Sequence, residues 1–148
     1  MTKPRILVAD DHPVMLAALG EILDELGEVV GLVTDGHALV EAARRLKPDL
    51  IISDISMPRM DGLEATREVQ ISAPKSKVII LTVHREALYV SIAFDAGARG
   101  YLLKQSALAE LPQAVQRVLE GERYVGADVA GREEWMSAEP RRGPYAPA

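Results

Sequence analysis

The sequence predicts an α/β fold in which one parallel β-sheet is covered by helices on both faces. Two observations support this fold class. Short segments rich in Val, Ile and Leu recur along the chain, and several are apolar throughout, which is typical of parallel strands buried on both sides. Between them lie segments with apolar residues three and four positions apart, the spacing of a helix with one buried face. The length of 148 residues fits a single domain.

The first half of the chain contains three of the expected strands. Residues 5–9 form the first strand, and helical spacing follows between residues 15 and 26. Residues 28–33 form the second, and the helical pattern after it covers residues 39–46. The third strand, residues 50–53, is apolar up to its final serine.

The second half continues the same alternation. A weaker helical pattern at residues 63–71 precedes the fourth strand at residues 78–81. Another weak helix at residues 87–96 leads to the fifth strand at residues 100–103, and residues 108–119 have clear helical spacing. Each strand is thus followed by a helix, which is a (βα)₅ arrangement.

A doubly wound sheet in three layers is the simplest explanation of this alternation. The flavodoxin-like strand order 2-1-3-4-5 is one of two common solutions, and it places ligand sites at the carboxyl ends of the strands. We expect the domain to cover residues 1–122. Residues 123–148, which are rich in proline toward their end and lack periodicity, are expected to form a tail or linker without a second domain. Within them, Trp135 is expected to pack on the domain or to contact a partner.

Composition excludes several classes of function. The absence of cysteine excludes disulfides, zinc–thiolate sites and thiol chemistry. The net charge of −5, with scattered Lys and Arg, argues against binding of nucleic acid by this chain. No apolar run is long enough to span a membrane, and the N-terminus does not resemble a signal peptide. We therefore expect a cytoplasmic protein.

Polar side chains follow four of the five expected strands. The first strand ends on Asp10 and Asp11, the third on Asp54, the fourth on Thr82 and the fifth on Lys104. In the expected topology these four strands are neighbours, so their carboxyl ends meet at one edge of the sheet. The sequence therefore predicts an acidic site with one lysine and one hydroxyl group.

Such a cluster requires positive charge. Two carboxylates about 4 Å apart repel each other by about 4 kcal/mol at an effective dielectric constant near 20. Oxygen ligands without His or Cys suit Mg²⁺ or Mn²⁺. Lys104 and the Thr82 hydroxyl can bind a phosphoryl group, and Asp54 is placed to be the nucleophile that forms an aspartyl phosphate.

Each of these residues also has an ordinary structural explanation. Asp11 followed by Pro13 is a common start of a helix, with the aspartate as the N-cap. Asp54 can cap the turn that follows it, Thr82 can be a plain strand residue, and Lys104 can be solvated. The combination of all four strand ends favours the functional interpretation.

The chain resembles the response regulator receiver domain of two-component signalling, the CheY-like family, between residues 5 and 120. The resemblance lies in four segments: VADDHP, SDISMPRMDG, ILTVH and GARGYLLK. The chain departs from many receivers at Gln105, where they have proline. The segments GARGYLLK and GERYV are similar in sequence to receivers of NarL/FixJ-type (LuxR-type) regulators. Members of that group usually continue into a DNA-binding segment, so a transcription regulator and a single-domain regulator both remain open.

The resemblance implies a role for each site residue. Asp54 would accept a phosphoryl group from a sensor histidine kinase or phosphotransfer protein, with Thr82 and Lys104 contacting that group. The metal ligands would be Asp10 (largely through water), Asp11, Asp54 and the backbone carbonyl of Ser56.

Further residues would set the response. Ser56 and His84 lie two residues after Asp54 and Thr82, where receivers tune hydrolysis of the phosphate, although His84 can also be a solvated loop residue. Tyr101 matches the switch aromatic that turns inward when Thr82 moves. The resemblance also implies a homodimer through the face of the fourth helix, fifth strand and fifth helix.

The protein is expected to be a switch that catalyses only its own phosphorylation and dephosphorylation. Two alternatives remain. One is a Mg²⁺-dependent phosphatase with an aspartyl nucleophile after the first strand, for which Asp10 would be the residue. It is disfavoured because the second Asp of the usual Asp-x-Asp motif is replaced by His12. The other is a pseudo-receiver that only binds partners.

Overall fold

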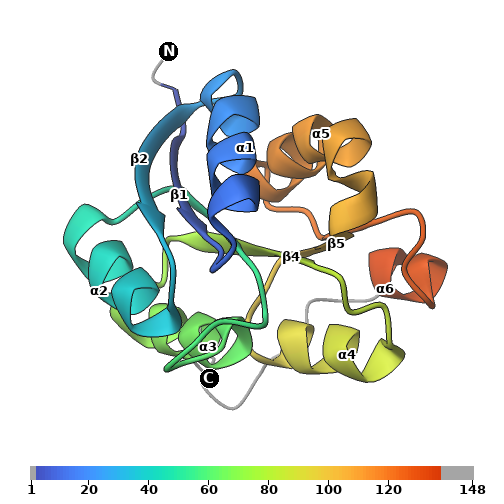
Figure 1. The fold of residues 1–148 in the computed structure, drawn as a ribbon. Helices are drawn as coiled ribbons and strands as arrows, with labels where there is room; N and C mark the ends of the chain where they lie inside the picture. Colours follow the sequence, from blue (N-terminus) through green and yellow to red (C-terminus); the bar gives the residue numbers. More distant parts are fainter. Residues whose placement is uncertain (1–2, 138–148) are drawn as a thin grey trace.

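A six-stranded parallel sheet forms the centre of the molecule (Figure 1). The computed structural model describes residues 3–137. The strand order is β2-β1-β3-β4-β5-β6, so the expected order of the first five strands is confirmed and a sixth strand is added at the β5 edge. The strands are β1 (Arg5–Ala9), β2 (Glu28–Val33), β3 (Leu50–Ser53), β4 (Lys77–Thr82), β5 (Gly100–Leu103) and β6 (Tyr124–Val125).

Helices cover both faces of this sheet. Helices α1 and α5 lie on one face and α2, α3 and α4 on the other, which gives the expected three layers (Figure 1). Within residues 3–137, no helix has the length and apolar character to cross a membrane. The helices are α1 (Pro13–Asp24), α2 (Gly36–Leu46), α3 (Gly62–Ser72), α4 (Ala87–Asp95), α5 (Ala107–Leu119) and α6 (Arg132–Ser137), and a short 3₁₀ helix (Lys104–Ser106) precedes α5.

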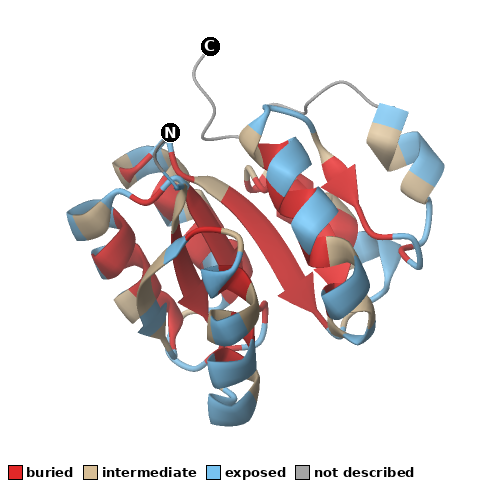
Figure 2. Cartoon of the chain, turned by 90° about the horizontal axis from the view of Figure 1, so that it is seen from above, coloured by how far each residue is buried: buried red, intermediate tan, exposed pale blue. Residues whose placement is uncertain are grey.

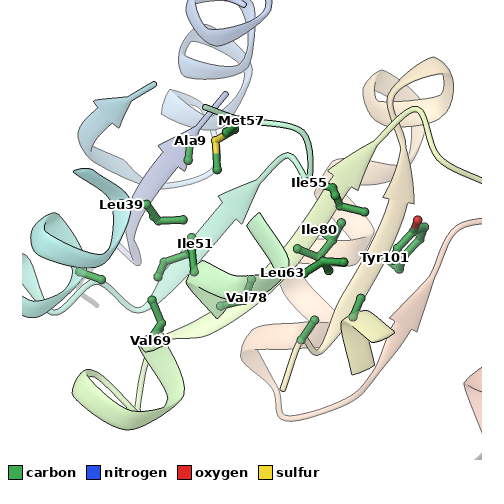
Figure 3. Packing of buried hydrophobic residues seen from close by; sticks show 14 of the residues in the cluster. Ala9, Leu39, Ile51, Ile55, Met57, Leu63, Val69, Val78, Ile80 and Tyr101 are labelled. Atoms are coloured by element: carbon green, nitrogen blue, oxygen red, sulfur yellow. The ribbon is translucent and has the colours of Figure 1, made fainter. Parts of the chain in front are cut away.

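The central strands are buried on both sides, which explains why their sequences are apolar throughout. Figure 2 shows β3 and its neighbours as the buried centre of the domain. Ile51 and Ile80 point into the core beneath α2, α3 and α4 (Figure 3), whereas Ile52 and Ile79 point into the core beneath α1 and α5. Because side chains alternate along a strand, each apolar residue of β3 belongs to one of the two cores.

The ordered structure continues beyond the boundary expected at residue 122. Tyr124 and Val125 form the added strand β6, Val129 is buried, and α6 follows. The ring of Trp135 packs on Phe94 of α4 with 5.1 Å between ring centroids, so the expectation that Trp135 packs on the domain is confirmed. Residues 138–148 of the expected tail lie outside the described residues.

The N-cap residue of α2, Asp35, also contacts the loop between β3 and α3. The Asp35 carboxylate caps α2 by accepting a hydrogen bond of 2.8 Å from the Ala38 backbone N–H. It also forms a 2.8 Å ion pair with Arg59, which has a left-handed backbone conformation. The Ala38 hydrogen bond lowers the pKa of Asp35 from its ordinary value of 3.8, against the opposing effect of burial, and Arg59 lowers it further.

The Asp35 contacts lead to a test of stability. Asp35→Ala is expected to reduce the free energy of unfolding by about 1 kcal/mol at pH 7, because it removes the cap. The folded-state pKa is lowered, so this stabilisation is present above pH 3.8 and is lost as the pH falls through the folded-state value. Urea unfolding of the wild type and Asp35→Ala at a series of pH values, from pH 7 to below 3.8, measures the difference in free energy of unfolding. An equal difference at every pH would contradict the assignment.

Candidate functional site

The carboxyl ends of β1, β3, β4 and β5 bring the expected polar residues to one edge of the sheet. Strand register produces this convergence, because Ala9 pairs with Ser53, and Thr82 pairs with Leu103. Asp10 and Asp54, which follow the first pair, therefore emerge side by side, and Lys104 follows Leu103 at the same edge, on the other side of β4. Thr82, at the end of β4, is completely buried beside them.

Lys104 lies between two buried carboxylates. Its ammonium nitrogen is 2.8 Å from Asp10 Oδ2 and 2.8 Å from Asp54 Oδ2. The two aspartates are only 1% and 4% exposed. Burial alone would lower the pKa of Lys104, but hydrogen bonds to Asp10 and Asp54 outweigh that effect and raise the pKa. Lys104 is therefore charged at neutral pH, and the triad keeps one net negative charge.

The Asp54 carboxylate is held in place by the loop that follows β3. Its Oδ1 accepts a 2.7 Å hydrogen bond from the Ile55 backbone N–H. The N-terminus of α3 approaches closely, because the Gly62 N–H donates to the Ile55 carbonyl and a Cβ on Gly62 would overlap the Asp54 carbonyl oxygen. Only glycine fits there. The Asp54 carboxylate thus accepts a hydrogen bond from the next residue, Ile55, and the N-cap of helix α3 is a different residue, Asp61.

Asp11 and His12 complete the acidic cluster. The N-cap of α1 is His12, without a side-chain cap bond, so the alternative in which Asp11 merely caps this helix is wrong. The His12 Nδ1 atom lies 3.1 Å from Asp10 Oδ1 and 3.1 Å from Asp11 Oδ1. One imidazole N–H cannot bond both oxygens fully, and Asp11 Oδ1 is buried without another hydrogen-bond partner in the described structure.

This donor set fits a divalent cation. One ligand atom from each of Asp10, Asp11, His12 and Asp54 lies within 4.8 Å of the others. The carboxylate oxygens suit a hard cation. The sequence prediction contained the three aspartates and missed His12. The sequence feature that could have indicated His12 is its position directly after the Asp10-Asp11 pair. The contact itself depends on the start of α1, which directs the imidazole toward both carboxylates.

Ser56 and His84 meet above the site. The Ser56 hydroxyl oxygen and His84 Nε2 are 3.0 Å apart. The His84 ring stacks on Tyr89 of α4 at 4.3 Å between centroids, and the His84 N–H donates to the Thr82 hydroxyl oxygen at 3.3 Å. His84 is therefore a structured residue with contacts to the loop after β3, to β4 and to α4.

Tyr101 occupies an inward position. Its side chain is completely buried and belongs to the cluster drawn in Figure 3, and its hydroxyl donates a 2.6 Å hydrogen bond to the His84 carbonyl. Burial raises the pKa of the Tyr101 phenol, and negative charge on Glu86 raises it further. The hydroxyl therefore stays protonated and remains a donor.

Comparison with known proteins identifies similar chains. Residues 6–116 match the family model of the response regulator receiver domain. The response regulator GacA of Pseudomonas viridiflava is 37% identical over 139 residues, which cover 93% of this chain and 65% of GacA. The chain thus spans about 65% of the length of this curated relative.

Solved structures agree with this match. The receiver domain of the putative response regulator NarL from Mycobacterium tuberculosis is 32% identical with a TM-score of 0.78, and the match covers 82% of this chain and 100% of that receiver-domain chain. A LuxR-family two-component response regulator from Aurantimonas sp. SI85-9A1 is 31% identical with a TM-score of 0.84, covering 90% of this chain and 99% of that one. The resemblance to NarL and LuxR-type receivers is confirmed.

The position of Lys104 between two buried carboxylates leads to a second test. Lys104→Met is expected to reduce the free energy of unfolding by about 3 kcal/mol at pH 7, because it leaves two adjacent negative charges without a partner. The pKa of Lys104 is raised, so its stabilisation is full below the ordinary value of 10.5 and is lost as the pH rises through the higher folded-state value. Chemical unfolding from pH 7 to alkaline pH measures this.

Lys75→Met is the matched control, because Lys75 is exposed. It should change stability by less than about 0.5 kcal/mol. A Lys104→Met protein as stable as the control would show that the triad contributes nothing to the folded state.

Proposed function

This chain belongs to the response regulator receiver domain family, and we propose on that premise that Asp54 is its phosphoacceptor. The observation that supports this assignment best is the contact of Lys104 Nζ with both Asp10 and Asp54 at 2.8 Å. It places one cation beside a nucleophile that is held at the carboxyl edge of the sheet. The donor is a sensor histidine kinase or a phosphotransfer protein.

In the proposed reaction an Asp54 carboxylate oxygen forms a bond to phosphorus while the phosphorus–nitrogen bond of the donor's phosphohistidine breaks. The leaving nitrogen keeps the bonding electron pair and the imidazole takes a proton from solvent. Lys104 already contacts Asp54 Oδ2, so a small movement of its ammonium group allows it to bind a phosphoryl oxygen. The Thr82 hydroxyl is the second donor.

Asp10, Asp11 and Asp54, together with the Ser56 backbone carbonyl, would hold Mg²⁺ or Mn²⁺. The ion would supply positive charge next to the phosphoryl oxygens. The protein's own contribution is the convergence of the Asp10, Asp11 and Asp54 carboxylates, whose ligand atoms lie within 4.8 Å of one another and of His12. Because His12 Nδ1 lies 3.1 Å from two of these carboxylates, the imidazole has to turn away when a cation binds there.

Hydrolysis returns the switch to its resting form. A water oxygen bonds to phosphorus, the phosphorus–oxygen bond to Asp54 breaks, and Asp54 leaves as a carboxylate. The hydrogen-bonded pair of Ser56 and His84 is fixed by the stack on Tyr89 and by the bond of the His84 N–H to Thr82. We assign this pair the control of the phosphate lifetime.

The output is a change in the face formed by α4, β5 and α5. The Thr82 hydroxyl moves toward the phosphoryl group, and this favours the inward position of Tyr101 that the structure already has, with the hydroxyl on the His84 carbonyl. The changed face would form a homodimer. Similarity to LuxR-type regulators supports a role in transcription, in the cytoplasm, where ATP supplies such phosphoryl groups. The only reactions of this switch are gain and loss of its own phosphoryl group.

Phosphorylation by a small donor tests the assignment of Asp54. With acetyl phosphate and Mg²⁺, the protein is expected to gain the mass of one phosphoryl group, sensitive to hydroxylamine, on the peptide that contains Asp54. Asp54→Asn should abolish the gain, because an amide cannot attack phosphorus in this way. Removal of divalent ions with a chelator should reduce the rate about a hundredfold, since about 3 kcal/mol of charge stabilisation is lost.

Asp24→Asn is the control, because Asp24 is an exposed residue at the end of α1, and it should be phosphorylated normally. A label on Asp10 would instead support the phosphatase alternative. A protein that gains no phosphate under any of these conditions would be a pseudo-receiver.

The Ser56–His84 pair leads to a kinetic test. His84→Ala is expected to shorten the lifetime of the phosphorylated protein about fivefold without preventing its formation, because it removes one hydrogen bond of about 1 kcal/mol that narrows the approach of water. Phosphate release after removal of the donor measures the lifetime. Ser56→Ala should have the same effect, and the double variant should add little. His37→Ala, at an exposed position, is the control. An unchanged lifetime in both single variants would refute the role of the pair.

A further inference from the structure

The segment after α5 covers the edge of the sheet at which Tyr101 lies. Strand β6 pairs with β5 so that Tyr101 is opposite Val125, and the Gly126 N–H donates a 2.9 Å hydrogen bond to the Tyr101 carbonyl. Without β6, β5 would be an edge strand, and its residues would border solvent. We call residues 124–137 the C-terminal cover.

Helix α6 closes the outer side of β6. The Val125 N–H, which points away from β5, donates to the Met136 sulfur at 3.1 Å, and the Val125 carbonyl accepts a 2.8 Å hydrogen bond from Arg132 Nε. Both outward backbone groups of Val125 are therefore bonded to side chains of α6. The exposed backbone of an ordinary edge strand is absent at this position.

Aromatic and cationic groups attach α6 to α4. The Trp135 ring lies 5.1 Å from Phe94, and the Arg123 guanidinium lies 4.4 Å from the Phe94 centroid. Arg123 also donates a 3.2 Å hydrogen bond to the Trp135 carbonyl. In Figure 1, α6 lies beside α4 at the β5 side of the sheet. The cover thus spans β5 and α4, the elements assigned above to the output face.

The cover also fills the space on the solvent side of Tyr101. Val125 and Val129 belong to the same buried cluster as the Tyr101 side chain, and Trp135 and Met136 pack against that cluster. Tyr101 has no exposed surface. An outward position of the ring would need this space or would have to displace the cover.

We propose that the C-terminal cover is a clamp in cis that holds Tyr101 in its inward position and thereby favours the phosphorylated conformation of the domain. The proposal rests on the function proposed above, in which inward Tyr101 accompanies phosphorylation. Because linkage is reciprocal, a group that favours inward Tyr101 also favours binding of a phosphoryl group at Asp54.

The test uses the whole 148-residue chain labelled with 3-fluorotyrosine at its four tyrosines. Tyr101→Phe assigns the Tyr101 fluorine resonance. A soluble gadolinium chelate then reports exposure of the ring, and titration with beryllium fluoride and Mg²⁺, a mimic of phosphoryl aspartate, reports the affinity of the site. The variants are Trp135→Ala, which removes the stack on Phe94, and the milder Arg132→Gln, which removes the bond to Val125. Glu134→Gln, on the exposed side of α6, is the control.

The expected results are a shielded Tyr101 in the wild type and control, and an exposed one in both variants. Half-saturation with beryllium fluoride should rise about fivefold in the variants, a modest coupling of the usual size. Equal Tyr101 shielding and equal affinity in all four proteins would overturn the clamp. If no protein binds beryllium fluoride but the variants expose Tyr101, the clamp is supported as a structural element and the phosphoacceptor role of Asp54 fails.

Discussion

The site depends on one electrostatic constraint, namely that a single ammonium group balances two buried carboxylates. Lys104 contacts Asp10 and Asp54 at equal distances of 2.8 Å, and the register of β1, β3 and β5 produces that arrangement. The triad has a residual negative charge, and Asp11 adds another beside it. Removal of the ammonium group would leave the two buried carboxylates without a partner, which is costly. Lys104 is therefore expected to stabilise the fold at the edge where we propose that Asp54 reacts.

Much of this arrangement was predictable from the sequence. Strands such as β3 and β4 are apolar on both faces, so their sequences identify a parallel sheet. The shared carboxyl edge of parallel strands then predicts that Asp10, Asp54 and Lys104 meet. The rest depends on tertiary contacts. Tyr124 and Val125 are too few to give a periodic signal, and their strand exists because β5 offers an open edge and α6 bonds its outer side. His12 likewise needs the start of α1 to reach the carboxylates.

His84 connects the candidate site with Tyr101 and with helix α4. The backbone N–H of His84 bonds to Thr82, its carbonyl accepts the Tyr101 hydroxyl, and its ring contacts Ser56 and Tyr89. In the proposed switch, a displacement of the Thr82 hydroxyl would act on Tyr101 through the backbone of this one residue, and on α4 through a ring stack. Such a short path would carry a small change at the carboxyl edge to a helix surface without a rearrangement of the sheet.

The same reasoning gives a physical meaning to the C-terminal cover. The family match ends at residue 116, whereas the packed structure includes Val129 and Trp135. A receiver that ended at α5 would leave β5 as an edge strand, and no residues after α5 would pack beside Tyr101. Here the chain supplies its own sixth strand, and residues of the C-terminal cover share the buried cluster of Tyr101. Under the proposed clamp, the equilibrium of the switch would be set jointly by its carboxyl edge and by residues that follow the family match.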